Sequence, residues 1–147
     1  MAELAPIGVL GAGSWGTALA ILLAGNGCPT RLWGHEPAHV RRLQAARENA
    51  EFLAGAPFPP ALEAVTDLAA ALDRATDALV VVPSQAFASV LEGLRDAAPQ
   101  GLRVAWATKG FEPSSAEPLH LLARRILGPG VPPAVISGPT LAGDALR

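Results

Sequence analysis

The amino-acid sequence predicts the α/β fold class, with a doubly wound, mostly parallel sheet and helices on both of its faces. Two observations predict it. Short aliphatic segments alternate with longer segments of helical periodicity, as expected of parallel strands joined by right-handed crossovers. Residues 79–82 are four consecutive aliphatic residues, the pattern of a central strand covered on both faces. The 147 residues fit one domain, which we assign to residues 1–147.

The expected elements alternate along the whole chain. Strands are expected at residues 7–10, 30–33, 62–65, 79–82, 104–107 and 134–137. Helices are expected at about 15–26, 37–50, 68–72, 85–98 and 116–127. The segment FLAGAPFPPALEA, at residues 52–64, is rich in proline and glycine, and we expect a loop there that leads into the third strand.

Local signals support the helices in turn. The first helix is expected to carry Leu19, Leu22 and Leu23 on one face. Pro37 can open the second helix because the N–H groups of a first turn have no partner, and Asp67 is expected to cap the third. The fourth helix has apolar residues at helical spacing, namely Phe87, Val90, Leu91 and Leu94.

Composition and charge exclude several classes of function. The formal net charge is −2 without a basic block, which argues against a nucleic-acid partner. No apolar run approaches the roughly 20 residues that cross a bilayer, and the N-terminal MAELAP does not resemble a secretory signal. Cys28 is the only cysteine, and the spacings of His35, His39 and His120 match no metal-ligand motif. We therefore expect a cytoplasmic protein without a metal site or membrane insertion.

The glycines of GVLGAGSWGTALA, at residues 8–20, carry the clearest chemical signal. A helix that begins directly after a strand directs unpaired N–H groups and its positive dipole end at the turn, where an anion is stabilised. Gly11 would permit the tight turn, Gly13 the approach of a pyrophosphate to the backbone, and Gly16 close packing of helix and strand. The strand-turn-helix context favours dinucleotide binding over a glycine-rich turn without a ligand.

The end of the second strand leaves the choice of dinucleotide open. An acidic residue is expected there to bind the ribose 2′-hydroxyl of NAD. The chain has His35 and Glu36 at this point. Glu36 facing the ribose would favour NAD, whereas His35 beside a 2′-phosphate would admit NADP; in a third interpretation both are solvated turn residues. We therefore predict NAD or NADP as the cofactor.

Three further segments follow strands, at the edge where ligands bind in open α/β sheets. Pro83 follows the fourth strand and serves equally well as a strand terminator. Lys109 follows the fifth; as the only lysine of the chain it is suited to a phosphate or carbonyl oxygen, unless it is an ordinary surface lysine. Gly138 and Thr140 follow the sixth and offer an open backbone and a hydroxyl, or a simple helix cap.

These segments resemble bacterial-type NAD(P)-dependent glycerol-3-phosphate dehydrogenase over nearly the whole chain, in the same order and spacing. The matching segments are GAGSWGTALA at 11–20, LWGH at 32–35, VPS at 82–84, WATKG at 106–110 and SGPTLA at 137–142. The resemblance implies a Rossmann-type cofactor-binding domain of an enzyme that interconverts dihydroxyacetone phosphate and sn-glycerol 3-phosphate for phospholipid synthesis. It allows a homodimer of the full-length protein.

The resemblance also implies roles for individual residues. Ser14, Trp15, His35 and Ala142 would contact the cofactor together with the three glycines, and Lys109 would contact both cofactor and substrate. Gly138 and Thr140 would contact the substrate. The family usually has a glutamate where this chain has Asp144, and the loop at 52–55 departs mildly from its usual sequence.

In the family, an all-helical domain follows and supplies the lysine that exchanges the proton at the substrate oxygen. This chain ends at Arg147, and we expect no catalytic residue within it. Since proton transfer needs an acid within hydrogen-bond reach, we expect residues 1–147 alone to bind cofactor weakly and to turn over negligibly. A dehydrogenase of another small substrate and a non-catalytic dinucleotide-binding module are the alternatives.

Overall fold

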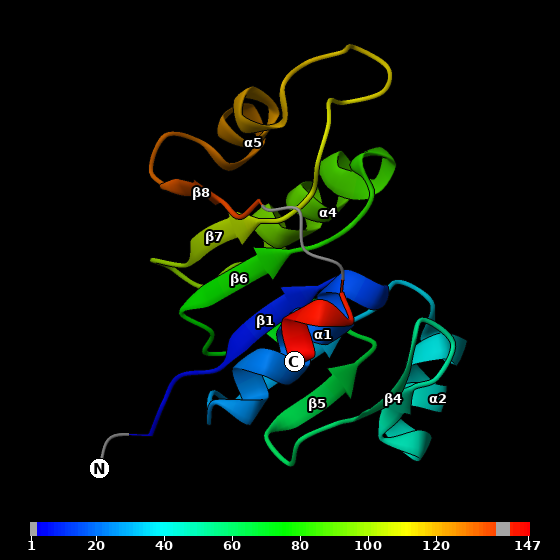
Figure 1. Cartoon of the computed structure of the whole chain (residues 1–147). Coiled ribbons are helices and arrows are strands. Elements are labelled where there is room, and N and C mark those ends of the chain that lie inside the picture. Colours follow the sequence, from blue (N-terminus) through cyan, green and yellow to red (C-terminus); the bar gives the residue numbers. More distant parts are fainter. Residues whose placement is uncertain (1–2, 138–141) are drawn as a thin grey trace.

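The computed structural model, which describes residues 3–137 and 142–147, contains a six-stranded sheet (Figure 1). The strands of this sheet are β1 (Ile7–Leu10), β2 (Thr30–Trp33), β5 (Leu62–Val65), β6 (Asp77–Val80), β7 (Arg103–Trp106) and β8 (Pro133–Val135). Their order is β5-β2-β1-β6-β7-β8, and every neighbouring pair is parallel. The predicted fold class is confirmed.

Helices cover both faces of this sheet (Figure 1). They are α1 (Ser14–Gly25), α2 (Pro37–Ala46), α3 (Leu68–Leu72), α4 (Ser84–Ala97), α5 (Leu119–Leu127) and a short 3-10 helix, η1 (Asp144–Leu146). The alternation of strand side chains divides the core in two: Leu10 and Val80 face α3, α4 and α5, whereas Val9 and Leu79 face α1 and α2. No helix among the described residues is long and apolar enough to span a bilayer.

The most deeply buried positions of helix α1 are small residues and not its leucines. The buried positions are Gly16, Thr17, Ala18, Ala20 and Ala24, while Leu22 is 42% exposed and Leu19 and Leu23 are half-buried. The predicted leucine face is present: Leu19 and Leu23 pack against the core between helix and sheet, whereas Leu22 is exposed. Small side chains let the helix axis approach the strands closely, which the glycine turn before it requires.

The main difference from the predicted elements is a second, two-stranded sheet formed by β3 (Glu48–Asn49) and β4 (Leu53–Pro57). We expected a helix up to residue 50 and a loop from 52. Helix α2 instead ends at Ala46, followed by Arg47 in a left-handed conformation at φ 55°. The Arg47 carbonyl then accepts from the Phe58 N–H at 2.8 Å, which closes the hairpin.

Other boundaries differ by a few residues. Strand β6 begins two residues earlier than expected, because Asp77 pairs with Ile7 and Arg103 in the sheet register. Helix α5 begins at Leu119, three residues later than expected. Helix α3 and its cap agree with the prediction, since the Asp67 carboxylate accepts from the Ala69 N–H at 3.2 Å.

Candidate functional site

The candidate site lies at the carboxyl edge of the parallel sheet. From β1 the chain proceeds to β2 and β5 on one side, then returns to β6 beside β1 and continues to β7 and β8 on the other. The point between β1 and β6 is thus a topological switch point, where a crevice forms in open α/β sheets. Because all strands are parallel, the segments predicted to bind ligand follow strand ends at this one edge.

Two of the three turn glycines are required by contacts within the fold. Gly11 has φ +132°, and a Cβ there would overlap the Val81 carbonyl oxygen. A Cβ at Gly16 would overlap the Gly11 carbonyl oxygen. The turn is also tied to its neighbours, since Gly11 N–H donates to the Trp33 carbonyl and Val81 N–H donates to the Leu10 carbonyl. Close packing alone therefore accounts for Gly11 and Gly16.

Gly13 is different because, its two chain neighbours aside, no atom of the described residues lies within 4 Å of the position that its Cβ would take. It is the N-cap residue of α1, is exposed, and has an extended conformation that any residue can adopt. Its neighbours Ser14 and Trp15 begin the helix, with Ser14 exposed and Trp15 half-buried. The first turn of α1 contains no acidic residue, so its N–H groups and dipole favour an anion.

The residues after β2 lie next to this turn. His35 and Glu36 are both exposed, and β2 is hydrogen-bonded to β1 along its whole length. Gly34 is buried, and a Cβ there would lie 2.9 Å from Val40 Cγ2 and 3.1 Å from Ala12 Cβ. Gly34 thus lets α2 and the glycine turn approach each other, which brings the two exposed residues near the glycine turn.

Lys109 lies on the other side of the switch point, two strands away from β1, which is roughly 10 Å. Its side chain is exposed. The preceding residue, Thr108, is buried; its hydroxyl donates to the Val82 carbonyl at 2.7 Å and accepts from the Val82 N–H at 3.3 Å. Thr108 therefore joins the turns after β6 and β7 and fixes the position of the backbone from which Lys109 extends. The sequence around Thr108 gives no local signal for this role, because it depends on a contact with Val82, 26 residues away.

The loop that follows Lys109 is organised around Glu112. Its carboxylate accepts from the Ser114 hydroxyl at 2.6 Å and from the N–H and hydroxyl of Ser115 at 2.7 and 2.8 Å. These hydrogen bonds, that of Ser114 first, lower the pKa of Glu112 to about 2. The Glu112 N–H in turn donates to the Glu117 carbonyl at 2.9 Å, so this loop carries its own hydrogen-bond network.

The remaining predicted site residues are only partly described. Gly138 and Thr140 lie outside the described residues. Ala142 is half-buried and lies two residues before η1, which packs against α1 (Figure 1). Asp144 is exposed and lies within 4 Å of the Arg147 guanidinium. The C-terminal segment thus returns to the side of the sheet on which α1 lies.

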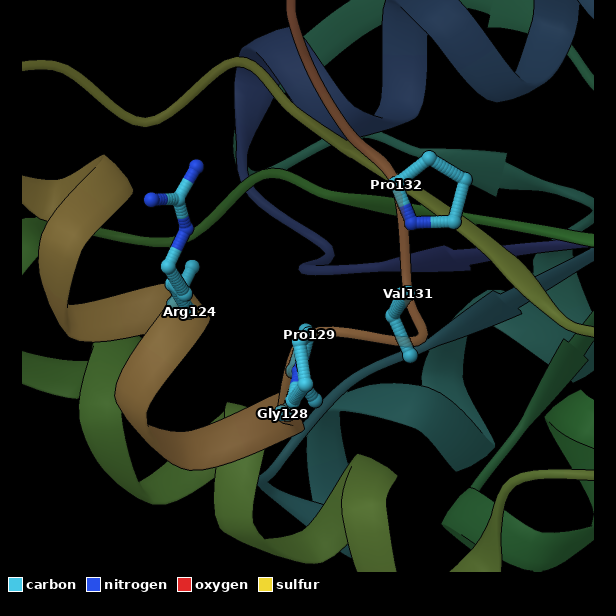
Figure 2. Close-up of a pocket in the computed structure, with 7 residues that line it drawn as sticks. Arg124, Gly128, Pro129, Val131 and Pro132 are labelled. Atoms are coloured by element: carbon cyan, nitrogen blue, oxygen red, sulfur yellow. The ribbon is translucent and has the colours of Figure 1, made fainter.

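A separate pocket lies at the opposite edge of the sheet, where the chain enters β8. Figure 2 shows it between α5, which carries Arg124, and the segment from Gly128 to Pro132. This edge holds the amino ends of the strands, so the pocket is remote from the glycine turn. Among the described residues, no group of three or more histidine, cysteine, aspartate or glutamate side chains is arranged to hold a metal ion.

A doubly wound parallel sheet with a glycine-rich turn at its switch point defines a dinucleotide-binding domain of the Rossmann class. Residues 6–146 match the family described as NAD-dependent glycerol-3-phosphate dehydrogenase N-terminus. The chain belongs to this family, as the resemblance predicted.

Individual relatives agree with this assignment. The chain is 55% identical over 138 residues to glycerol-3-phosphate dehydrogenase [NAD(P)+] of Xanthomonas euvesicatoria, which covers 94% of this chain and 40% of that protein. It is 53% identical to the enzyme of that name from Stenotrophomonas maltophilia, covering 96% of this chain and 41% of the relative. The crystal structure of glycerol-3-phosphate dehydrogenase from Coxiella burnetii superposes with a TM-score of 0.93 at 45% identity, over 97% of this chain and 43% of that one. The chain thus spans about two fifths of the length of these relatives.

Proposed function

We propose that this chain is the cofactor-binding part of an NAD(P)-dependent oxidoreductase that interconverts dihydroxyacetone phosphate and sn-glycerol 3-phosphate. In the reducing direction, dihydroxyacetone phosphate, NAD(P)H and one proton give sn-glycerol 3-phosphate and NAD(P)+. The observation that carries the proposal is the open position at Gly13, at the N-terminus of α1, in a chain of this family. The product is a precursor of phospholipids, and the proposed location is the cytoplasm.

The residues present fit a dinucleotide. Gly13, Ser14 and Trp15 would hold the diphosphate at the helix N-terminus, where backbone N–H groups stabilise negative charge. Gly11 and Gly16 would contribute by shaping the turn that holds the diphosphate. When bound, the dinucleotide supplies the hydride, so the task of the protein is to orient it and to polarise the substrate carbonyl.

The second group of residues would act on the substrate side. Lys109 would contact both cofactor and substrate, because an exposed ammonium beside the switch point can neutralise a phosphate or polarise a carbonyl oxygen. Gly138 and Thr140 would bind the substrate, and Ala142 the cofactor. At the β2 end, His35 and Glu36 would face the ribose, and their balance would set the preference for NAD or NADP.

In this proposal, residues 1–147 form the nucleotide-binding domain. A helical domain of the full-length enzyme would supply the lysine that transfers the proton. A homodimer is the proposed assembly of that enzyme. On this proposal the 147-residue chain binds NADH or NADPH weakly and shows negligible turnover, which calorimetry and a rate assay would measure.

The deciding experiment assays the full-length protein that carries these residues, with dihydroxyacetone phosphate and either NADH or NADPH. Oxidation of one of the two cofactors is expected. No oxidation of either would reject the proposed reaction. Oxidation with a different small ketone only would indicate a dehydrogenase of another substrate, and binding without any turnover would indicate a non-catalytic module. Calorimetry with both cofactors separates these outcomes from a failure to bind any dinucleotide.

A further inference from the structure

A buried asparagine, Asn49, reaches the glycine turn from the small β3–β4 sheet. Its side chain is 0% exposed. Its amide nitrogen donates to the Ala12 carbonyl at 3.0 Å and to the Thr17 hydroxyl at 2.8 Å, both of which belong to the turn and the start of α1. Asn49 is separated from them by more than thirty residues of sequence. Through these two hydrogen bonds, the buried side chain of Asn49 links the β3–β4 sheet to the glycine turn and the start of α1.

The hydrogen-bond partners of Asn49 determine the orientation of its amide. The Phe52 N–H can only donate, and it donates to Asn49 Oδ1 at 3.3 Å. The Ala12 carbonyl can only accept, so Nδ2 must face it. His39 Nε2, 3.2 Å from Oδ1, must therefore be the donor of that contact. The side chain is held on both sides and cannot rotate its amide without losing hydrogen bonds to fixed backbone groups.

The contact with Ala12 has a direct consequence for Gly13. In a trans peptide the carbonyl of one residue and the N–H of the next point in opposite directions. The Ala12 carbonyl is drawn toward the buried Asn49, so the Gly13 N–H points the other way, toward the exposed side of the turn.

We propose that Asn49 is a positioning residue for cofactor binding, which fixes the Ala12–Gly13 peptide so that the Gly13 N–H faces the diphosphate. This inference rests on the proposed function of the turn. The same side chain contacts His39 on α2, the helix that follows His35 and Glu36. Asn49 therefore holds the diphosphate-binding turn and the ribose-binding segment in one arrangement before any ligand binds.

The test compares Asn49→Asp with Thr17→Val in the 147-residue chain. Asn49→Asp keeps the shape and the acceptor for Phe52 but loses the donor to Ala12, whereas Thr17→Val removes the hydroxyl that accepts from Asn49 and leaves the Ala12 contact in place. Affinity for NADH is measured by calorimetry at a temperature where every variant is folded. We expect an approximately tenfold loss for Asn49→Asp and less than about twofold for Thr17→Val. Equal losses, or an unchanged affinity for Asn49→Asp, would overturn the inference.

Two further measurements keep the result decisive. If Asn49→Asp does not fold, Asn49→Ala replaces it with the same expected loss. In the unsubstituted chain, NMR should show a slowly exchanging Asn49 side-chain amide and a Gly13 amide resonance that shifts when NADH binds; rapid exchange of that side chain would overturn the inference without any variant. If the unsubstituted chain binds no dinucleotide, the proposed function fails. The effect of Asn49 on the Ala12–Gly13 peptide can still be tested in that case, by comparing the Gly13 amide resonance of the unsubstituted chain with that of the Asn49 variant. An unchanged resonance would overturn the inference.

Discussion

The turn after β1 and the loop after β7 end at the same edge of one sheet, but they are built in different ways. The turn after β1 is set mainly by main-chain atoms in close contact, with Gly11 against Val81 and Gly16 against Gly11, and the hydrogen bonds of Asn49 add to this. The loop after β7 is fixed by side-chain hydrogen bonds, first from Thr108 and then around Glu112. One side of the candidate site is therefore held mainly by backbone packing and the other by hydrogen bonds of polar side chains.

This difference shows what a glycine motif indicates. Gly11 and Gly16 are needed for the chain to fold into this turn, whether or not a ligand binds. Of the three glycines, Gly13 is the one that contacts between described residues do not explain, so Gly13 is the position at which the motif points to a ligand. On the β7 side no such separation exists, because an exposed lysine can have a structural role, a ligand-binding role or both.

The largest expected effect is on folding. Gly11→Ala would place a Cβ against the Val81 carbonyl at a φ that L side chains rarely adopt, and we expect it to lower the free energy of unfolding by about 3 kcal/mol. Urea denaturation measures this loss. Gly25→Ala is the matched control, since outside its own helix no atom of the described residues lies within 4 Å of that Cβ position and φ is ordinary; its effect should be below about 1 kcal/mol. Equal effects of the two variants would contradict the packing account of the turn.

The next effect separates binding from stability. Gly13→Val adds a branched side chain at a position where no atom of the described residues beyond the chain neighbours lies near the Cβ, and where we expect it to meet the diphosphate. We expect affinity for NADH and NADPH to fall about 100-fold or more, while the free energy of unfolding changes by about 1 kcal/mol or less. Calorimetry and urea denaturation on the same samples check both. Retained binding would contradict the assignment of Gly13 to the diphosphate.

The backbone side of the crevice could be predicted from the sequence because its signals are local. The strand at 7–10, the glycine spacing and the proline that opens α2 each act on adjacent residues, and all were found in place. The leucine spacing of α1 identified a face of which Leu19 and Leu23 pack against the core, but it did not show that small residues take the most deeply buried positions. Gly16 already indicated this, because a Cβ there would overlap the Gly11 carbonyl oxygen, so the start of the helix lies directly against the turn.

The parts that escaped prediction depend on contacts between distant residues. Asn49 lies in a charged stretch, RENAE, which has no strand periodicity, and it is buried only because the glycine turn and His39 meet there. Strand β6 was misplaced because Val81 and Val82 continue its aliphatic run past the last paired residue. The preference between NAD and NADP also stays a prediction, since His35 and Glu36 are both exposed and equally placed to reach a ribose.

A moderate effect is expected on the β7 side. Lys109→Ala should weaken dinucleotide affinity of the chain about tenfold, and in the full-length enzyme raise the apparent KM for the phosphate substrate and lower kcat. Arg95→Ala is the charge-matched control, because Arg95 is exposed in the last turn of α4, on the opposite edge of the sheet. Identical kinetics for parent and Lys109→Ala would reduce Lys109 to a surface residue. Unlike Gly11→Ala, neither variant should lower the free energy of unfolding by more than about 1 kcal/mol.

A smaller effect concerns cofactor choice. His35→Asp places a carboxylate at the end of β2, where it can accept from the ribose 2′-hydroxyl of NADH and repel the 2′-phosphate of NADPH. The ratio of the two dissociation constants should shift severalfold toward NADH, measured by calorimetry with both cofactors. Glu36→Gln is the companion variant and should shift the ratio the other way if Glu36 faces the ribose. No change in either variant would indicate that both side chains are solvated.

The smallest effect follows from the titration of Glu112. Its folded-state pKa of about 2 lies below its ordinary value of 4.5, so the hydrogen bonds from Ser114 and Ser115 stabilise the loop fully above pH 4.5 and are lost as the pH falls toward 2. The amide resonance of Ser115 should therefore move between about pH 4 and 2, and Glu112→Gln should abolish this movement. Over the same range the amides of Gly11 and Gly16 should stay in place, because main-chain packing holds them without a titrating group. If the amides of Ser115, Gly11 and Gly16 all moved in one common transition, the turn after β1 and the loop after β7 would unfold together in acid. The proposed difference in how these two segments are held would then be wrong at low pH.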